Sequence, residues 1–182
     1  DYFSKNTVEG TLYFEYLPTG TNVRINGDQC YTAASLIKLP VAMEYYKSVE
    51  KGKIDPSLSI SLKQEWLDDE FGDLYKKGAG YTLTLQEAVS IMLKNSDNTA
   101  LRAILETNTD NLTAEERALN SLDIEYNISS ADQTLQIGTR SYSSFLKCLY
   151  YACYNTKEHS QEILDMLSET EFSNRIAGGI PD

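Results

Sequence analysis

Residues 33–40 read AASLIKLP and place a serine, Ser35, three positions before a lysine, Lys38. The apolar residues of this stretch and of the sequence after it recur at helical spacing, and a glycine follows as a stop signal. The sequence therefore predicts a helix over residues 34–51, with Ser35 at its N-terminal end. Because side chains three residues apart on a helix are neighbours, we expect Lys38 to reach Ser35.

The Ser-x-x-Lys pattern is not specific by itself, because roughly one match is expected by chance in this composition. Three matches occur, at Ser35/Lys38, Ser48/Lys51 and Ser144/Lys147. The triplet Ser96-Asp97-Asn98 is rarer: 17 Ser, 12 Asp and 11 Asn in 182 residues give roughly 0.07 expected copies. It lies between two predicted helices, where capping of backbone groups is the alternative explanation.

Composition indicates one soluble globular domain with a sizeable core, since 41% of the 182 residues are hydrophobic and 24% are charged. A net charge of −11 disfavours binding to nucleic acid or to an anionic membrane surface. No apolar stretch approaches the roughly 18 residues of a membrane span. The chain opens on DYFSKNTVEG, which is unlike a signal peptide, so we expect any export signal to have been removed.

Three cysteines and one histidine offer little for metal or redox chemistry. Cys30, Cys148 and Cys153 are interpreted as small buried hydrophobic residues. The last two lie five positions apart on one predicted helix, on different faces, so we expect no bridge between them. His159 is the only histidine, which leaves too few ligands for zinc, and no cofactor is expected.

The predicted fold is α+β, with an N-terminal β-hairpin in residues 1–33 and a mainly helical part in residues 34–182, in one domain. Two strands, in 11–20 and 21–30, flank the turn at Pro18-Thr19-Gly20. A short extended piece is expected at 57–63. Further helices are predicted within 85–95, 99–108, 112–124, 137–155 and 159–170, the first of them opened by a capping box at Thr84 and Glu87.

Ser-x-x-Lys at the head of a buried helix, followed 61 residues later by Ser-Asp-Asn in an interhelical loop, resembles the class A β-lactamase-like family of penicillin-recognising serine hydrolases. The resemblance selects Ser35/Lys38, and we expect the other two pairs to lie on the surface. It implies that Ser35 is the nucleophile, that Lys38 is its base and that Ser96 relays a proton to the leaving nitrogen. Asn98 would hold Lys38 or the substrate amide, and Asp97 would brace the loop.

The resemblance also implies a function. An ester would form on Ser35 with a β-lactam or a D-alanyl-D-alanine peptide of peptidoglycan. The alternative is a penicillin-binding or cell-wall-binding module with little or no turnover. A hydrolase that uses His159 is disfavoured, because polar residues surround it on both sides. Such substrates place the protein outside the cytoplasmic membrane, in an extracellular, periplasmic or cell-surface location.

One departure from the family is the Lys-Thr-Gly motif, which no residue after Ser96 matches. Arg140 and Arg175 are the only basic candidates on chemistry, and neither lies in that pattern. The tail RIAGGIPD, residues 175–182, resembles the family's segment just before the missing strand. We therefore expect residues 1–182 to form a single incomplete domain that lacks the rest of its antiparallel sheet, with the missing C-terminal segment as its one stable protein partner.

The second departure concerns the glutamate that activates the hydrolytic water in class A β-lactamases, in a Glu-x-x-x-Asn pattern. The nearest match is Asp123-x-x-x-Asn127, with Glu125 beside it; Asp132 has a better separation but no asparagine. The stretch 119–133 is interpreted as a helix end with a short loop, and its carboxylates as solvated.

Overall fold

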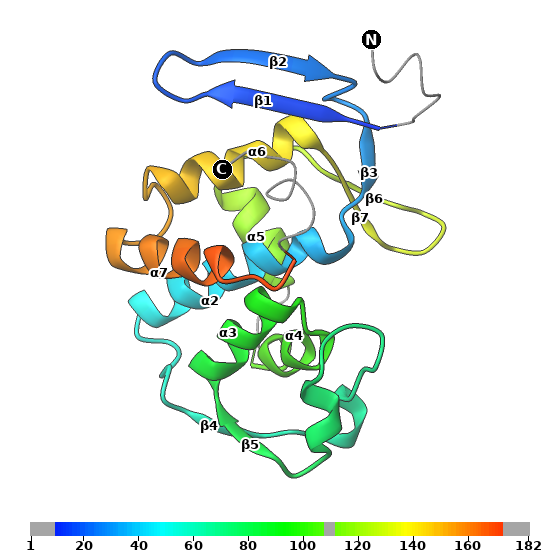
Figure 1. The fold of residues 1–182 in the computed structure, drawn as a ribbon, viewed down its shortest axis with the longest axis vertical. Coiled ribbons are helices and arrows are strands. Elements are labelled where there is room, and N and C mark those ends of the chain that lie inside the picture. The colour runs from blue at the N-terminus through cyan, green and yellow to red at the C-terminus, as the bar shows by residue number, and fades with distance from the viewer. Residues whose placement is uncertain (1–9, 108–111, 173–182) are drawn as a thin grey trace.

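A computed structural model describes residues 10–107 and 112–172 of the chain (Figure 1). The strands are β1 Leu12–Tyr16, β2 Thr21–Ile25, β3 Cys30–Thr32, β4 Ser59–Ser61, β5 Thr82–Thr84, β6 Asn127–Ile128 and β7 Leu135–Gly138. The α-helices are α2 Lys38–Glu50, α3 Leu85–Asn95, α4 Asn98–Leu105, α5 Ala114–Ser121, α6 Thr139–Tyr150 and α7 Lys157–Ser168. Short 3-10 helices are η1 Ala34–Ile37, η2 Gln64–Trp66 and η3 Leu74–Lys77. The predicted α+β class is confirmed.

Helix α2 is the central element of the fold. It is buried on nearly all sides, as expected for a helix whose apolar residues are not confined to one stripe. Helices α3, α5 and α7 pack around it, and its buried hydrophobic side chains belong to the single hydrophobic core of the described residues. The core residues that α2 contributes are Leu39, Val41, Ala42, Met43, Tyr45 and Tyr46.

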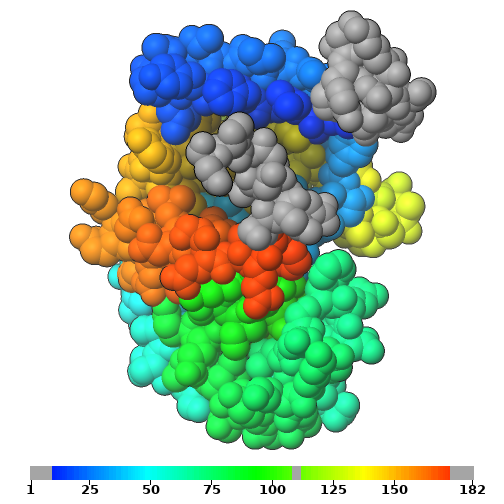
Figure 2. Space-filling view, viewed as in Figure 1, coloured from blue at the N-terminus to red at the C-terminus, as the bar shows by residue number. Residues whose placement is uncertain are grey.

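The predicted hairpin is confirmed: β1 and β2 pair antiparallel, with Phe14 opposite Val23. It lies across α6 at one end of the molecule (Figures 1 and 2). Alternation along β1 turns Tyr13 and Glu15 inward, and Glu15 forms a 3.0 Å ion pair with Lys147 of α6. This contact corrects the expectation for Ser144/Lys147, since Lys147 is only partly exposed and joins the hairpin to the helical part.

A second sheet was not predicted. Strands β6 and β7 form a hairpin, and β7 also pairs antiparallel with β3, giving the order β3-β7-β6. Residues 119–133 therefore contain the expected helix end, followed by a strand that begins a hairpin rather than by loop alone. Sequence signals missed these strands because β6 is two residues long and the turn residues after it are polar.

The opposite end of the molecule holds α3, α4 and the two-strand sheet β4-β5 (Figure 1). The expected extended piece at 57–63 is confirmed as β4, which pairs with β5. Helix α3 begins with the predicted capping box, in which Thr84 accepts from the Glu87 N–H and Glu87 accepts from the Thr84 N–H. The cap fixes where α3 begins, and the left-handed Ser96 follows its last residue, Asn95.

The predicted helix over 34–51 is two helices. Residues 34–37 form the 3-10 helix η1, and α2 begins only at Lys38. Ala34 adopts a left-handed φ of 45°, which is strained for a residue with a Cβ atom and interrupts regular helix geometry just before Ser35. Ser35 is thus on a tight turn ahead of α2 and remains exposed, while Lys38 is buried.

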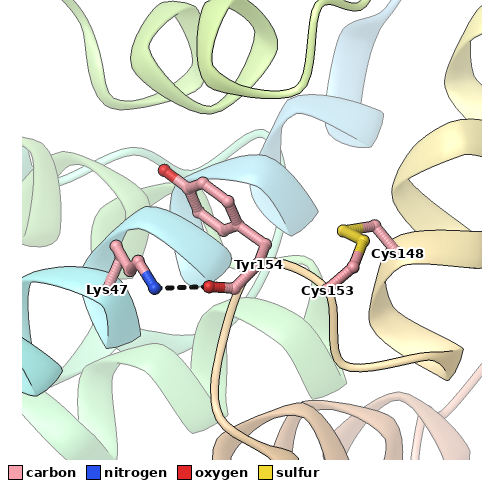
Figure 3. The surroundings of a disulfide bond; sticks show 4 residues. All are labelled: Lys47, Cys148, Cys153 and Tyr154. Atoms are coloured by element: carbon pink, nitrogen blue, oxygen red, sulfur yellow. Dashed lines mark hydrogen bonds between the residues drawn. A yellow bond between two sulfur atoms is a disulfide. The ribbon is translucent and has the colours of Figure 1, made fainter.

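A disulfide joins Cys148 and Cys153, and the expectation that they would not bridge was wrong (Figure 3). That expectation placed both residues on one helix, but α6 ends at Tyr150. Ala152 then adopts a left-handed φ of 51°, and the Cys153 N–H donates to the Cys148 carbonyl at 2.9 Å. The chain therefore turns back on the helix end. Cys153 is exposed and Cys30 half-buried, so only Cys148 is a buried cysteine.

The segment after the disulfide is fastened to α2. Lys47 donates to the Tyr154 carbonyl (Figure 3), and Asn155 Nδ2 donates to the Met43 carbonyl at 2.8 Å. One turn further on, His159 lies 2.9 Å from Glu50. The prediction that His159 is a surface residue at a helix start is correct in position, but its ring is half-buried against α2.

Among the described residues, no helix is both long and apolar enough to cross a bilayer. The tail 175–182, including Arg175, lies outside the described residues.

The disulfide should contribute about 2 kcal/mol to the free energy of unfolding, because it closes a short loop in the unfolded chain. We expect Cys148→Ser/Cys153→Ser to unfold at lower urea concentration than the parent, and dithiothreitol to lower the stability of the parent but not of this double variant. Cys30→Ser is the matched control and should respond to dithiothreitol as the parent does. Equal stability of the double variant and the parent under oxidising conditions would contradict a bridge between these residues.

Candidate active site

Ser35 and Lys38 come together at the junction of η1 and α2. Their side chains lie on the same side of the turn, with Lys38 Nζ 3.3 Å from Ser35 Oγ. The expected hydrogen-bond distance is confirmed, although the connecting turn is 3-10 rather than α-helical. In a 3-10 helix residues i and i+3 lie one above the other, which suits this contact. Tyr142 of α6 donates to the Leu36 carbonyl at 3.0 Å and so ties η1 to α6.

Ser96, Asp97 and Asn98 occupy the junction of α3 and α4, as predicted. Ser96 ends α3 in a left-handed conformation with φ of 53°, Asp97 caps α4, and Asn98 is the first residue of α4. The left-handed residue reverses the chain and turns the Ser96 side chain toward Ser35, whose Oγ lies 3.0 Å from Ser96 Oγ. The two motifs therefore meet although 61 residues separate Ser35 from Ser96.

Lys38 Nζ lies at the centre of the group. It is within 2.9 Å of Ser96 Oγ and 2.8 Å of Asn98 Oδ1, and it also donates to the Ser96 carbonyl. Together with Ser35 Oγ these make four acceptors, whereas an ammonium group has three N–H donors. Lys38 therefore cannot donate a separate N–H to each of the four acceptors at the same time. The arrangement allows protons to redistribute among Lys38, Ser35 and Ser96.

Burial lowers the pKa of Lys38 below its usual 10.5, because water no longer solvates the charged form fully. The carboxylates of Asp97 and Asp68 oppose this and raise the pKa. Burial is the larger effect. The structure therefore favours the neutral amine of Lys38 more than water does, and a neutral amine can accept a proton.

Asp97 braces the loop through backbone contacts, as expected. Its side chain is fully buried, accepts from the Ala100 N–H at 2.8 Å and accepts from the Leu74 N–H at 2.9 Å. The second bond ties the α3–α4 junction to η3. Gly72 lies so close that a Cβ atom on it would stand 2.0 Å from Asp97 Oδ2. Only glycine fits there without displacing Asp97.

A pocket of about 320 Å³ opens beside the three polar side chains. Its other walls are almost wholly apolar and come from η1, α2, α3, α6 and α7. The lining residues are Ser35, Leu36, Lys38, Leu39, Met92, Leu93, Ser96, Tyr142, Leu146 and Leu167. Ser35 is thus exposed at one edge of a concave, apolar surface, which is common for small-molecule sites.

The structure does not bring the other candidate residues to this group. Asp123 and Glu125 are exposed beside β6, and Asp132 is exposed in the β6–β7 turn, where it accepts from Thr134. Arg140 pairs with Asp28 at 3.3 Å. Ser48 is buried in α2, so the expectation that Ser48/Lys51 is a surface pair was wrong for the serine.

Sequence reasoning missed Asp68 and Arg102. Asp68 is buried, accepts from Asn98 Nδ2 at 3.2 Å and pairs with Arg102 of α4. The contact joins residues 30 positions apart. The only signal was an acidic residue directly after an apolar Trp-Leu pair, and the acidic loop around it concealed that signal.

A model of the beta-lactamase enzyme family matches residues 1–182. The chain belongs to the beta-lactamase enzyme family. None of the curated proteins compared with it matches.

Solved structures agree with the family in their fold. The beta-lactamase from Sphaerobacter thermophilus superposes with a TM-score of 0.85 at 24% identity, covering 95% of this chain and 68% of that one. A mutant of PBP-A, solved as an acyl-enzyme complex with penicillin G, superposes with a TM-score of 0.85 at 21% identity. The match covers 94% of this chain and 67% of that one. A beta-lactamase from Chitinophaga pinensis superposes with a TM-score of 0.86 at 18% identity, covering 99% of this chain and 72% of that one. The chain therefore spans about two thirds of these proteins.

Substitution of Gly72 tests how tightly Asp97 is held. Gly72→Ala should destabilise the protein by about 2 kcal/mol more than Gly78→Ala, measured by urea unfolding. Both glycines have left-handed φ, 88° and 77°, but a Cβ atom on Gly78 meets nothing within 4 Å. The control therefore carries the conformational cost alone, about 1–3 kcal/mol for a side chain at the Gly78 φ of 77° and ψ of 168°. Equal costs for the two variants would mean that Asp97 moves aside easily.

Proposed function

We propose that the protein is an active-site serine hydrolase that forms an ester on Ser35 with a β-lactam or a D-alanyl-D-alanine peptide. The observation that carries the proposal is the position of Lys38 Nζ, within hydrogen-bond distance of both Ser35 Oγ and Ser96 Oγ. Membership of the beta-lactamase enzyme family and the acyl-enzyme solved for PBP-A support the same chemistry.

Acylation needs a base for the serine and an acid for the leaving nitrogen. The neutral amine of Lys38 takes the Ser35 proton while Ser35 Oγ bonds to the amide carbonyl carbon. When the C–N bond breaks, the nitrogen takes a proton from Ser96 Oγ, and Lys38 returns its extra proton to Ser96. The balance is an ester on Ser35 and a neutral amine, with Lys38 and Ser96 back in their starting protonation states. The backbone N–H groups at the η1 turn are candidate donors to the carbonyl oxygen.

Asn98 would both hold Lys38 and bind the substrate. Its Oδ1 accepts from Lys38, and of its two N–H donors one points to Asp68. The second donor is available for the carbonyl of a substrate amide. The apolar pocket beside Ser35 would then receive a nonpolar part of the same substrate.

The alternative is a penicillin-binding module that acylates and then turns over slowly or not at all. A specific observation favours it over an efficient β-lactamase: among the described residues, no carboxylate hydrogen-bonds to Ser35, Lys38 or Ser96. Hydrolysis of the ester needs a base for water, and the carboxylates near β6 are exposed.

We infer an extracellular, periplasmic or cell-surface location, where peptidoglycan and β-lactams are met. The Cys148–Cys153 disulfide supports this inference, because such bridges persist mainly in oxidising compartments.

Ser35→Ala should abolish the covalent adduct with a fluorescent penicillin, and Lys38→Met should slow its formation by about 10²–10⁴-fold. The measurement is intact-mass spectrometry of the full-length gene product. Ser144→Ala, the serine of another Ser-x-x-Lys match, is the control and should react as the parent does. An adduct on the Ser35→Ala protein would refute the assigned nucleophile.

Loss of the penicilloyl group should be slow, and Asp123→Asn, Glu125→Gln and Asp132→Asn should leave its rate unchanged. The reason is that none of these carboxylates contacts the reactive group, whereas a general base typically contributes about 10²–10⁴-fold. The decay of the adduct is followed by intact mass after removal of free penicillin. Rapid hydrolysis that collapses in Asp123→Asn would identify the segment before β6 as the functional loop.

A further inference from the structure

Asp68 lies behind the reactive group, on the segment between η2 and η3, and its place is fixed from two sides. Its N–H donates to Thr99 Oγ1 at 3.0 Å, which ties its backbone to α4. Its carboxylate is buried and makes three contacts: Oδ1 accepts from the Glu70 N–H at 3.0 Å and from Asn98 Nδ2 at 3.2 Å, and Oδ2 pairs with Arg102. A buried carboxylate with so many donors is held in one orientation.

The contact with Asn98 determines which way the amide of that residue faces. A carboxylate only accepts hydrogen bonds, so it selects the NH₂ end of the amide and leaves Oδ1 for Lys38. Without Asp68 the amide could rotate and turn its donors toward the ammonium group, where two donors would face each other. The orientation of Asn98 is therefore set from outside the pair.

We propose that Asp68, held by Arg102, is a positioning residue: it fixes the Asn98 amide with its oxygen on Lys38 and thereby keeps Lys38 directed at Ser35 and Ser96. The inference rests on the proposed function for its catalytic meaning, but the geometry concerns Lys38 itself. Asp68 touches no position at which a substrate atom would react, so it acts through Asn98.

The charges of Asp68 and Arg102 should also affect the ionisation of Lys38. The carboxylates that act on Lys38 are Asp97, in the α3–α4 junction, and Asp68, and Arg102 is bound to the latter. Asp68 stabilises the ammonium form of Lys38, and Arg102 offsets part of that effect. Removing the charge of Asp68 should make the neutral amine easier to form, whereas removing Arg102 should make it harder.

The test is a pair of substitutions with opposite expected signs. Asp68→Asn keeps the shape and an acceptor but removes the charge, and it should move the ionisation of Lys38 to lower pH by at least about 0.5 pH unit. Arg102→Gln leaves the Asp68 charge uncompensated and should move it to higher pH. Asp69→Asn, which changes the exposed neighbouring acid, is the matched control and should give no shift.

Two readouts keep the positioning role separate from the proposed function. Titration of ¹³C-labelled lysine by NMR, with Lys38 assigned from Lys38→Arg, reports the ionisation whether or not penicillin reacts. The pH profile of Ser35 acylation should move with it, and Asp68→Ala should slow acylation at least about tenfold while Asp68→Asn stays within a few-fold at its own optimum.

Equal or same-sign shifts in Asp68→Asn and Arg102→Gln would overturn the proposal, as would a parent rate of acylation in Asp68→Ala. If Asp68→Ala does not fold, as judged by thermal unfolding, the pair of opposite-sign variants decides the question. If the parent protein takes no penicillin at any pH, the proposed function fails, and the NMR titration still decides the role of Asp68.

Discussion

The buried amino group of Lys38 is the constraint on which the rest of the site depends. Moving an ammonium group out of water costs several kcal/mol unless hydrogen bonds replace the lost solvation. Its replacement acceptors come from η1 and from the α3–α4 junction, which are far apart in the chain. Lys38 therefore joins the start of the central helix to α4. The left-handed Ser96 and the buried Asp97 are the means by which that junction presents its oxygens inward.

The contacts around Lys38 have opposite effects on the stability of its charged form and on its reactivity as a base. Acceptors around Lys38 favour its charged form, whereas a general base must be neutral. Burial shifts the balance toward the neutral amine, since the pKa of Lys38 falls below 10.5 in the folded protein. The sign for stability follows: the charged form is penalised in the folded state, and this penalty is relieved as pH rises from the folded pKa toward 10.5. The site thus carries a cost at neutral pH that a purely structural lysine would avoid.

Sequence predicted the elements whose signals are local. The Thr84 capping box, the hairpin around Pro18 and the Ser96-Asp97-Asn98 junction each depend on residues within a few positions of one another. The disulfide was missed because the end of α6 is set by Ala152 in a left-handed conformation, which alanine does not signal. Asp68 was missed because its partners Asn98 and Arg102 are brought to it only by the packing of α4 against the loop.

The groups that the proposed reaction would use for acylation and for deacylation are held to different degrees around Ser35. The groups that would serve acylation are fixed by buried caps and by Lys38 itself, on η1, α2 and α4. The carboxylates that could serve deacylation are on or beside β6–β7, where Asp132 is exposed and its hydrogen bonds go to Thr134 in the same turn. A water held there would have no rigid partner near the ester. Under the proposed function, the described residues therefore favour formation of the ester over its hydrolysis, because among them only the groups for the first reaction are already in place.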